Sequence, residues 1–352
     1  MIKVLVVEDS AVARELICHI LSSDREITVM GTAANGEEAV DFVSRHKPDV
    51  ITMDIIMPKM DGFQATRAIM ETNPVPIVIV SASLVKEEVE KTWRAVEAGA
   101  VAALEKPRYS DLDGPGGEAA RLVQTVKLMA QVKVVRRWKR TGPAPAPPAS
   151  VRVPAPTVKD RVRTKPLVRI VAIGASTGGP QTLHRILTGL PAGFSVPILV
   201  VQHISPGFTA GFVDWLNRSS ILPVTIATHK ERALPGHVYV APDGLQMRVD
   251  SSCNITAVPD DPENGLRPAV SCLFRSVAQA FGDRAIGVLL TGMGRDGAEE
   301  LLLLKSKGAL TVAQDKESSI VFGMPAEAIK LGGARHVLPP DGIIELLRNS
   351  IV

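Results

Sequence analysis

The chain has only three cysteines in 352 residues, Cys18, Cys253 and Cys272, and no two of them form a CxxC pair. Cysteines that are few and scattered indicate reduced thiols rather than a disulfide framework or a zinc site. The sequence also lacks the run of about 18 apolar residues that a membrane-spanning helix requires. Its first apolar run is short and meets Glu8 and Asp9 at once, so no signal peptide is expected. These absences predict a cytoplasmic protein without membrane insertion.

Excess positive charge is confined to one segment. Residues 133–165 hold 10 Lys and Arg against a single acid, so this segment carries +9 and the remainder −6 of the total of +3. A nucleic-acid-binding domain would carry its positive charge on a folded face, so we expect no nucleic-acid partner. Prolines crowd the stretch from Pro143 to Pro166, which predicts an extended spacer. Docking to an acidic protein surface, or a weak attraction to a membrane surface, is the alternative for this segment.

Chain length and this spacer divide the sequence into two domains. Single cores stop growing well below 352 residues. We therefore expect domains over residues 1–125 and 167–352, joined by a helix end and a Pro-rich basic linker over 126–166. In the first domain, strand and helix patterns alternate, which is typical of a five-stranded parallel, doubly wound sheet. The expected strands are 2–7, 28–33, 50–53, 76–80 and 102–104, and the expected helices include 11–21, 36–46 and 117–135.

Charged and hydroxyl side chains stand at the ends of these expected strands. Glu8 and Asp9 end the first strand, and Asp54 ends the third; Ser81 and Lys106 end the fourth and fifth. The first and third strands are neighbours in a doubly wound sheet, so the three carboxylates would repel one another without a hard cation such as Mg²⁺. A single acid at a strand end is often only a helix cap. The joint pattern instead predicts transfer of a phosphoryl group to Asp54, whose oxygens the metal and lysine neutralise.

Together with the segment MDIIMPKMDG at residues 53–62, this pattern resembles the receiver domain of response regulators over about residues 1 to 125. The resemblance implies that a histidine kinase supplies a phosphoryl group to Asp54, and that Ser81 and Lys106 sense it. Many receivers carry an aromatic residue three positions before the lysine, and Ala103 excludes an aromatic switch at that site. The implied Mg²⁺ ligands are Glu8, Asp9, Asp54 and the backbone carbonyl of Ile56.

A glycine-rich turn, GASTGG at residues 174–179, opens the second domain between an apolar run and a helix-like stretch. The amide groups of such a turn can cradle a phosphate. A sharp strand-to-helix turn can equally hold Ser176 out as a nucleophile. Glycines also occur at such turns simply because they tolerate positive φ. The turn by itself does not choose between these interpretations, although it lacks the lysine of a P-loop and the full GxGxxG spacing of a nucleotide-binding module.

The rest of the domain favours the nucleophile. His203 follows one apolar run and Asp296 follows another, and parallel strands bring such ends to one edge of a sheet. In a triad the Ser176 hydroxyl attacks, the imidazole takes its proton, and the carboxylate fixes the tautomer. A lone histidine is more often structural, so the prediction depends on all three side chains together. The expected strands, 169–173, 197–201, 224–227, 237–240, 286–290 and 310–313, predict a second doubly wound α/β domain rather than the compact basic helix–turn–helix of a DNA-binding regulator.

Four segments carry a closer resemblance: IGASTGGP from 173, QHISPGF from 202, LTGMGRDG from 290 and VFGMP from 321. With the first domain, they resemble the CheB family of chemotaxis response regulator methylesterases over nearly the whole chain. The resemblance implies that Ser176 is the nucleophile, His203 the general base and acid, and Asp296 its orienting partner. It also makes Thr177 and Met293 candidates for oxyanion binding or positioning. No cofactor is expected for the ester chemistry.

The resemblance also implies a reaction and its partners. The enzyme would remove methyl groups from glutamate methyl esters in the cytoplasmic domains of methyl-accepting chemoreceptors. It would also deamidate receptor glutamines, and so oppose receptor methylation in chemosensory adaptation. We expect the unphosphorylated receiver to cover the site and phosphorylation of Asp54 to shift the population toward an open form. The Pro-rich linker would allow that movement.

Overall fold

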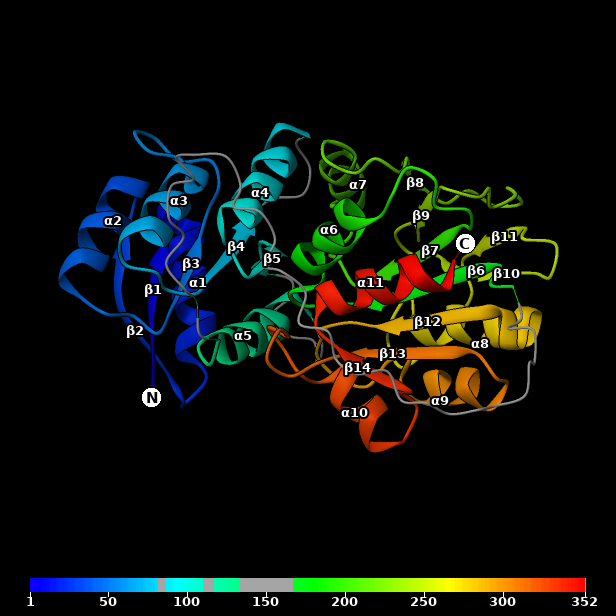
Figure 1. Cartoon of the computed structure of the whole chain (residues 1–352). Coiled ribbons are helices and arrows are strands. Elements are labelled where there is room, and N and C mark those ends of the chain that lie inside the picture. Colours follow the sequence, from blue (N-terminus) through cyan, green and yellow to red (C-terminus); the bar gives the residue numbers. More distant parts are fainter. Residues whose placement is uncertain (82–85, 110–116, 133, 135–166, 352) are drawn as a thin grey trace, which may run out of the picture.

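The computed structural model describes residues 1–81, 86–109, 117–132, 134 and 167–351, with the side chains of 86 and 87 excepted. It forms two α/β domains that lie side by side (Figure 1). Both sheets are parallel, as the alternation of strands and helices predicts. None of the described helices combines the length and the apolar composition that a bilayer crossing requires.

The N-terminal domain is a five-stranded sheet in the order β2-β1-β3-β4-β5. Successive residues of β1 point to opposite faces, so Val4 packs with α1 and α5, and Leu5 packs with α2, α3 and α4. Helices therefore cover both faces, which explains why the strands are nearly continuous apolar runs. The elements are β1 (Ile2–Val7), α1 (Ala11–Ser22), β2 (Ile27–Ala33), α2 (Gly36–Arg45), β3 (Val50–Met53), α3 (Gly62–Thr72), β4 (Ile77–Ser81), α4 (Lys86–Ala98), β5 (Ala102–Glu105) and α5 (Glu118–Met129).

The C-terminal domain is a seven-stranded parallel sheet in the order β14-β13-β12-β6-β7-β9-β8. Its first and central strand, β6, lies between β12 and β7. Helices α6, α7 and α11 pack on one face, and α8, α9 and α10 pack on the other. The elements are β6 (Ile170–Ala175), α6 (Gly179–Gly189), β7 (Ile198–Gln202), α7 (Thr209–Asn217), β8 (Val224–Ile226), β9 (Val238–Val240), β10 (Gln246–Val249), β11 (Ile255–Val258), α8 (Val270–Phe281), η2 (Gly282–Arg284), β12 (Ala285–Leu289), α9 (Ala298–Ser306), β13 (Leu310–Gln314), α10 (Met324–Lys330), β14 (His336–Leu338) and α11 (Pro340–Ser350).

Some details differ from the sequence-based expectation. The antiparallel pair β10–β11 and the edge strand β14 were not predicted, because these segments are only three or four residues long and mix polar with apolar residues. The helix expected over 117–135 ends at Met129. Most of the expected linker, 133 and 135–166, lies outside the described residues. The domain limits at 125 and 167 stay predictions.

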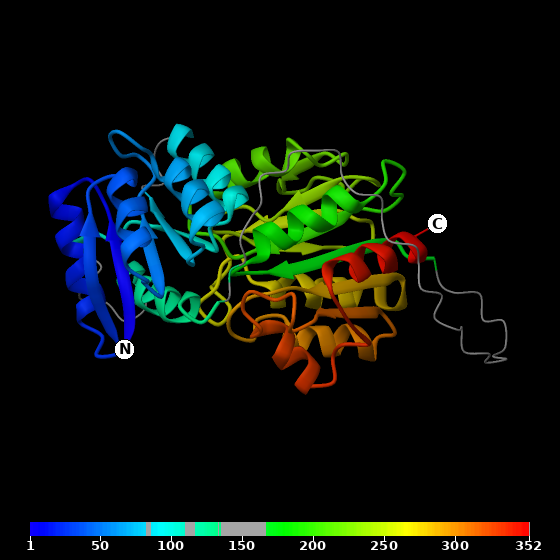
Figure 2. The same cartoon turned by 60° about the vertical axis from the view of Figure 1, so that its left-hand side comes forward.

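The two domains meet through α4, which lies against α6 and α7 (Figures 1 and 2). Trp93 is 2% exposed, and its ring centroid lies 5.0 Å from that of Phe212 and 5.6 Å from that of Trp215. Its Nε1 donates a hydrogen bond of 3.3 Å to the carbonyl of Phe208. The Gln181 amide of α6 donates to two carbonyls at the end of α4, at 2.7 and 3.1 Å. The contact is thus a desolvated aromatic cluster bordered by hydrogen bonds.

Candidate functional site

The turn between β6 and α6 presents Ser176 at the carboxyl edge of the C-terminal sheet. The chain reverses through Gly178, whose φ of +78° favours glycine, and a Cβ there would meet Ile320 at 2.6 Å. The amide of Ser176 donates to the carbonyl of Thr291 at 3.0 Å, and the amide of Gly179 donates to the carbonyl of Ser176 at 2.8 Å. Because these two amides are already bonded, the turn is poorly suited to cradle a phosphate. It is suited to hold a side chain out from a fixed backbone.

Neighbouring strands bring the other two predicted residues to the same edge. Strand β7 pairs with β6 on one side and carries His203 just past its end; β12 pairs on the other side and leads to Asp296. His203 Nε2 lies 2.9 Å from Asp296 Oδ2. Since Nε2 faces the carboxylate, Nδ1 is the nitrogen left for the Ser176 hydroxyl. In the described residues the hydroxyl has no hydrogen-bond partner, so it is free to turn toward that nitrogen or toward a substrate.

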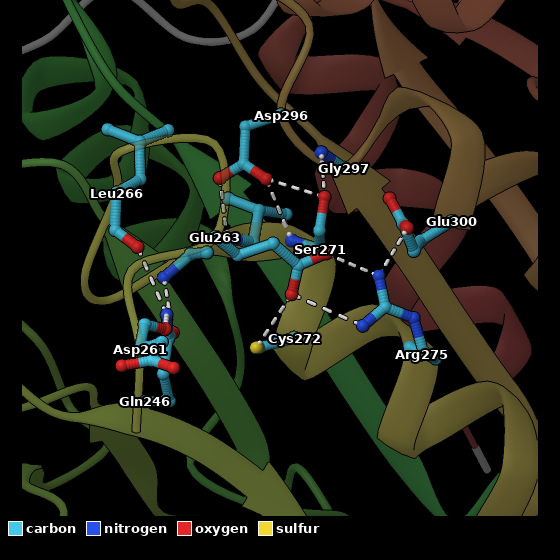
Figure 3. Close-up of polar contacts among 12 residues, drawn as sticks. Gln246, Asp261, Glu263, Leu266, Ser271, Cys272, Arg275, Asp296, Gly297 and Glu300 are labelled. Carbon is cyan, nitrogen blue, oxygen red and sulfur yellow. Dashed lines mark hydrogen bonds and ion pairs between the residues drawn. The ribbon is translucent and has the colours of Figure 1, made fainter. Parts of the chain in front are cut away.

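Asp296 is held where helix α8 begins. The amides of Val270 and Ser271 donate to its two oxygens at 2.6 and 3.0 Å, and the Ser271 hydroxyl donates to Oδ1 at 2.6 Å (Figure 3). Burial raises the pKa of Asp296, but the hydrogen bonds from His203 and Ser271 outweigh it and hold the pKa below its usual value. Asp296 therefore stays ionised beside the imidazole. Ser271 was not predicted from the sequence, whose only signal is a serine three residues after Pro268, at the start of an apolar helical pattern.

Thr177 and Met293 line the cavity, and their backbone amides are candidates for binding a developing oxyanion. Because the Ser176 amide is bonded to Thr291, it cannot bind a developing oxyanion. The amides of Thr177 and Met293 have no acceptor in the part of the chain that the structure describes. The residue after the nucleophile is the usual donor in a serine turn of this kind. The Thr177 side chain makes no hydrogen bond to His203 among the described residues.

Buried amide and hydroxyl side chains hold the turns that carry Ser176 and His203. Gln314, which has no exposed surface, accepts from the Thr291 amide at 2.8 Å, and the Thr291 hydroxyl donates to the carbonyl of Thr177 at 2.9 Å. Gln202 donates to the carbonyls of Ser176 and His203 at 2.8 and 3.0 Å. The sequence did not single out Thr291 or Gln202, because their partners lie up to 114 residues away. They restrain the nucleophile turn.

Ser176 and His203 open onto a cavity of about 420 Å³ between the domains, and Asp296 lies buried behind them. Ser176, His203 and Met293 line it from the C-terminal domain. Trp93, Ala103 and Arg121 are among the residues that line it from the N-terminal domain. Ala103, where many receivers carry an aromatic residue, is half-buried and lines this cavity.

The predicted carboxylate cluster is present in the N-terminal domain. Ligand oxygens of Glu8, Asp9 and Asp54 lie within 4.8 Å of one another. Lys106 Nζ lies 3.0 Å from Asp54 and 3.0 Å from Glu8. Burial raises the pKa of Glu8 to about 7, with the nearby Asp54 charge adding to the effect, and burial also raises the pKa of Asp54. Two desolvated carboxylates and one exposed carboxylate fit a hard divalent cation, which would stabilise their ionised forms against burial and mutual repulsion.

The two remaining predicted residues, Ser81 and Ile56, differ in their burial and their contacts. Ser81 is buried at the end of β4, and its hydroxyl donates to Glu88 of α4 at 2.5 Å rather than to Asp54. Ile56 is in the loop that follows β3, two residues after Asp54, and its side chain is exposed. Glu88 was not predicted from the sequence; through its bond to Ser81 it joins the end of β4 to α4, the helix that contacts the other domain.

Comparisons with known proteins agree with both domains. Residues 171–347 match the family model described as CheB methylesterase, and residues 4–112 match the response regulator receiver domain. The chain is 54% identical over 348 residues to a protein-glutamate methylesterase/protein-glutamine glutaminase of Syntrophus aciditrophicus, covering 99% of this chain and 97% of that one. It is 55% identical over 353 residues to a protein of the same description from Nitrosospira multiformis, covering 100% and 97%. The crystal structure of the Thermotoga maritima CheB methylesterase catalytic domain matches with a TM-score of 0.51 and 38% identity, covering 52% of this chain and 99% of that chain.

Proposed function

This chain belongs to the CheB methylesterase family and carries a receiver domain, and on that premise we propose that Ser176, His203 and Asp296 are its catalytic triad. The enzyme is a protein-glutamate methylesterase/protein-glutamine glutaminase that acts in chemotaxis adaptation under control of its receiver domain. The observation that carries the triad is the 2.9 Å hydrogen bond from His203 to the buried Asp296, at the sheet edge that also presents Ser176.

Ester hydrolysis follows from this geometry. The Ser176 oxygen attacks the ester carbonyl carbon while Nδ1 of His203 takes the hydroxyl proton, and Asp296 stabilises the imidazolium. The amides of Thr177 and Met293 donate to the oxyanion. His203 then gives its proton to the departing methoxide, so methanol leaves and an acyl-enzyme remains. A water, deprotonated by His203, cleaves the acyl-enzyme to the free glutamate side chain. With a glutamine substrate the leaving group is ammonia.

The receiver controls access to this site. Its Trp93 and Arg121 line the catalytic cavity, so the receiver domain covers part of the approach to Ser176 while the domains are in contact. We infer that the contact is inhibitory and that phosphorylation of Asp54 weakens it. Ser81, turned toward a phosphoryl group, would leave Glu88 and so disturb α4, which holds the contact. Lys106 would neutralise the same phosphoryl group from its place 3.0 Å from Asp54.

The receiver chemistry needs a divalent cation. Glu8, Asp9 and Asp54, with the carbonyl of Ile56, would hold Mg²⁺. The ion supplies positive charge to the phosphoryl oxygens. The ester chemistry uses only the residues of the C-terminal domain. The partners that follow are the methyl-accepting chemoreceptor cytoplasmic domains as substrate and a histidine kinase as phosphodonor, which places the reaction in the cytoplasm.

Methanol release from methylated receptors tests the triad. The full chain is compared with Ser176→Ala and with Ser195→Ala, an exposed serine of the same domain. We expect Ser176→Ala to lose at least about 1,000-fold in kcat and Ser195→Ala to keep the normal rate. Methanol release by Ser176→Ala at the normal rate would refute the assignment. Asp54→Asn is expected to keep the basal rate and to lose its response to a small phosphodonor; a full response would refute the regulatory proposal alone.

A further inference from the structure

The hydroxyl of Ser271 occupies a defined place between the triad and helix α8. It lies at the second position of α8 and is 3% exposed. The Gly297 amide donates to the Ser271 oxygen at 3.0 Å, and the same oxygen lies 2.6 Å from Asp296 Oδ1 (Figure 3). A serine hydroxyl has one proton. Since Gly297 supplies its own hydrogen, the hydroxyl proton can only point to the carboxylate.

The contacts of Asp296 show what this hydroxyl adds. Oδ2 accepts from His203 and from the Val270 amide, whereas among the described residues Oδ1 accepts only from Ser271, through its amide and its hydroxyl. Ser271 therefore supplies both hydrogen bonds that fix the oxygen not facing the imidazole. Without the hydroxyl, Oδ1 keeps only the longer of its two hydrogen bonds, from the Ser271 amide at 3.0 Å, so the rotation of the carboxylate about its Cβ–Cγ bond is held less firmly on that side. A rotated carboxylate no longer aligns Oδ2 with His203 Nε2.

The hydroxyl also joins two segments that are distant in sequence. Gly297 follows Asp296 in the turn before α9 and has a φ of +80°. By accepting from Gly297 and donating to Asp296, Ser271 attaches that turn to the start of α8. A helix N-terminus favours an anion, so α8 and Ser271 together keep the buried carboxylate charged. This arrangement stabilises the imidazolium that forms when Ser176 loses its proton.

We propose that Ser271 is a fourth, positioning member of the catalytic triad, which acts through Asp296 and does not touch the substrate. The inference rests on the proposed triad. Ser271 does not line the catalytic cavity, whereas Ser176 and His203 do. Its loss therefore changes kcat and leaves KM unchanged. Removing a charge-assisted hydrogen bond of this kind is expected to lower kcat about 10- to 100-fold.

Helix α8 offers a matched control. Ser276 lies five positions further along, and its hydroxyl also accepts one backbone amide, that of Val249 at 3.1 Å, and donates to one partner, the carbonyl of Leu273 at 2.7 Å. Ser276→Ala therefore removes the same number of hydrogen bonds, one accepted and one donated, from the same helix. It leaves Asp296 untouched. A purely structural role for Ser271 would give both alanine variants the same effect.

The test measures kcat and KM for methanol release from methylated receptors, with phosphodonor present, together with the thermal unfolding midpoint. We expect Ser271→Ala to lose about 10- to 100-fold in kcat with KM within twofold of normal. Ser271→Thr is expected to restore most of the rate, and Ser276→Ala to keep it. A kcat for Ser271→Ala within twofold of normal, or an equal loss in Ser276→Ala, would overturn the proposal.

A second pair keeps the test decisive if the alanine variant does not fold. Threonine and valine have nearly the same shape, and only threonine carries the hydroxyl. A kcat at least fivefold higher for Ser271→Thr than for Ser271→Val supports the proposal, and equal rates overturn it. Ser176→Ala is measured alongside: if it keeps the normal rate, the triad itself is wrong, whereas a dead Ser176→Ala with a fully active Ser271→Ala overturns only the role of Ser271.

Discussion

Replacing Trp93 by alanine should activate the enzyme without phosphorylation. Trp93 belongs to the receiver, yet its ring packs on Phe212 and Trp215 of the catalytic domain and its Nε1 bonds to the carbonyl of Phe208. No other contact in the described interface is both aromatic and fully desolvated on the receiver side. If the domain contact closes the catalytic cavity, its loss should open the cavity in every state of Asp54.

The size of the effect follows from the contacts. Two aromatic pairs contribute about 0.5–1.5 kcal/mol each, and the hydrogen bond contributes about 1 kcal/mol. Their sum, roughly 2–4 kcal/mol, shifts the balance of closed and open forms by roughly 30- to 800-fold, at about 1.4 kcal/mol per factor of ten. With an open form populated at about 1%, even the smaller shift opens roughly a quarter of the molecules. Basal methanol release should then rise roughly 20-fold.

The assay is methanol release from methylated receptors without phosphodonor, for Trp93→Ala alone and combined with Asp54→Asn. Both should show the same raised rate, because opening no longer needs phosphorylation. Arg218→Ala is the control at the same helix pair: it removes only an exposed ion pair with Glu90, of about 0.2–1 kcal/mol, so its rate should change less than about fivefold. A folded Trp93→Ala variant with the normal basal rate would refute closure through this contact, and so would a gain that Asp54→Asn abolishes.

Two further outcomes follow from the packing around the active edge. Gly174→Ala would place a Cβ 2.3 Å from Val270, so the free energy of unfolding in urea should fall by about 1–3 kcal/mol; activity should fall with it, because the Val270 amide holds Asp296. Gly193→Ala is the control, since its added Cβ meets nothing within 4 Å. Equal stability of the two variants would contradict the prediction and show that α8 can shift to make room for the added Cβ. Burial, with the hydrogen bond to Glu263 adding to it, raises the pKa of the Cys272 thiol to about 11, so only about one thiol in a thousand is ionised at pH 8. Iodoacetamide should therefore leave Cys272 unlabelled in the native protein and label it after unfolding, as measured by mass spectrometry. Labelling of Cys272 in the native protein would contradict this prediction.

The receiver site was predictable because its chemistry follows local patterns. Strands covered on both faces are continuous apolar runs, so their ends could be placed within one residue for β1 and β3. The order of a doubly wound sheet then put Glu8 beside Asp54. The same reasoning brought His203 and Asp296 together, a prediction that their 2.9 Å contact confirms. The role of that contact in catalysis stays a proposal.

The short strands and the supporting polar groups were not predictable in this way. Strands of three or four residues with mixed polarity, such as β10 and β11, have too few residues to show a period. The partner of Ser271 lies 25 residues away and that of Thr291 lies 114 residues away, so no local pattern marks either residue. A buried hydroxyl is recognised only when its hydrogen-bond partners are known.

The sequence by itself determined two parallel α/β domains and the residues at their strand ends, because hydrophobic period and strand order are properties of the chain. Only the tertiary structure decided how those residues are held and how they are covered. It showed that the Ser176 amide is already bonded to Thr291, whereas the amides of Thr177 and Met293 have no acceptor among the described residues. It also placed Trp93 against the catalytic domain. Such contacts depend on packing between segments more than 100 residues apart, and the local sequence of either segment does not indicate its partner.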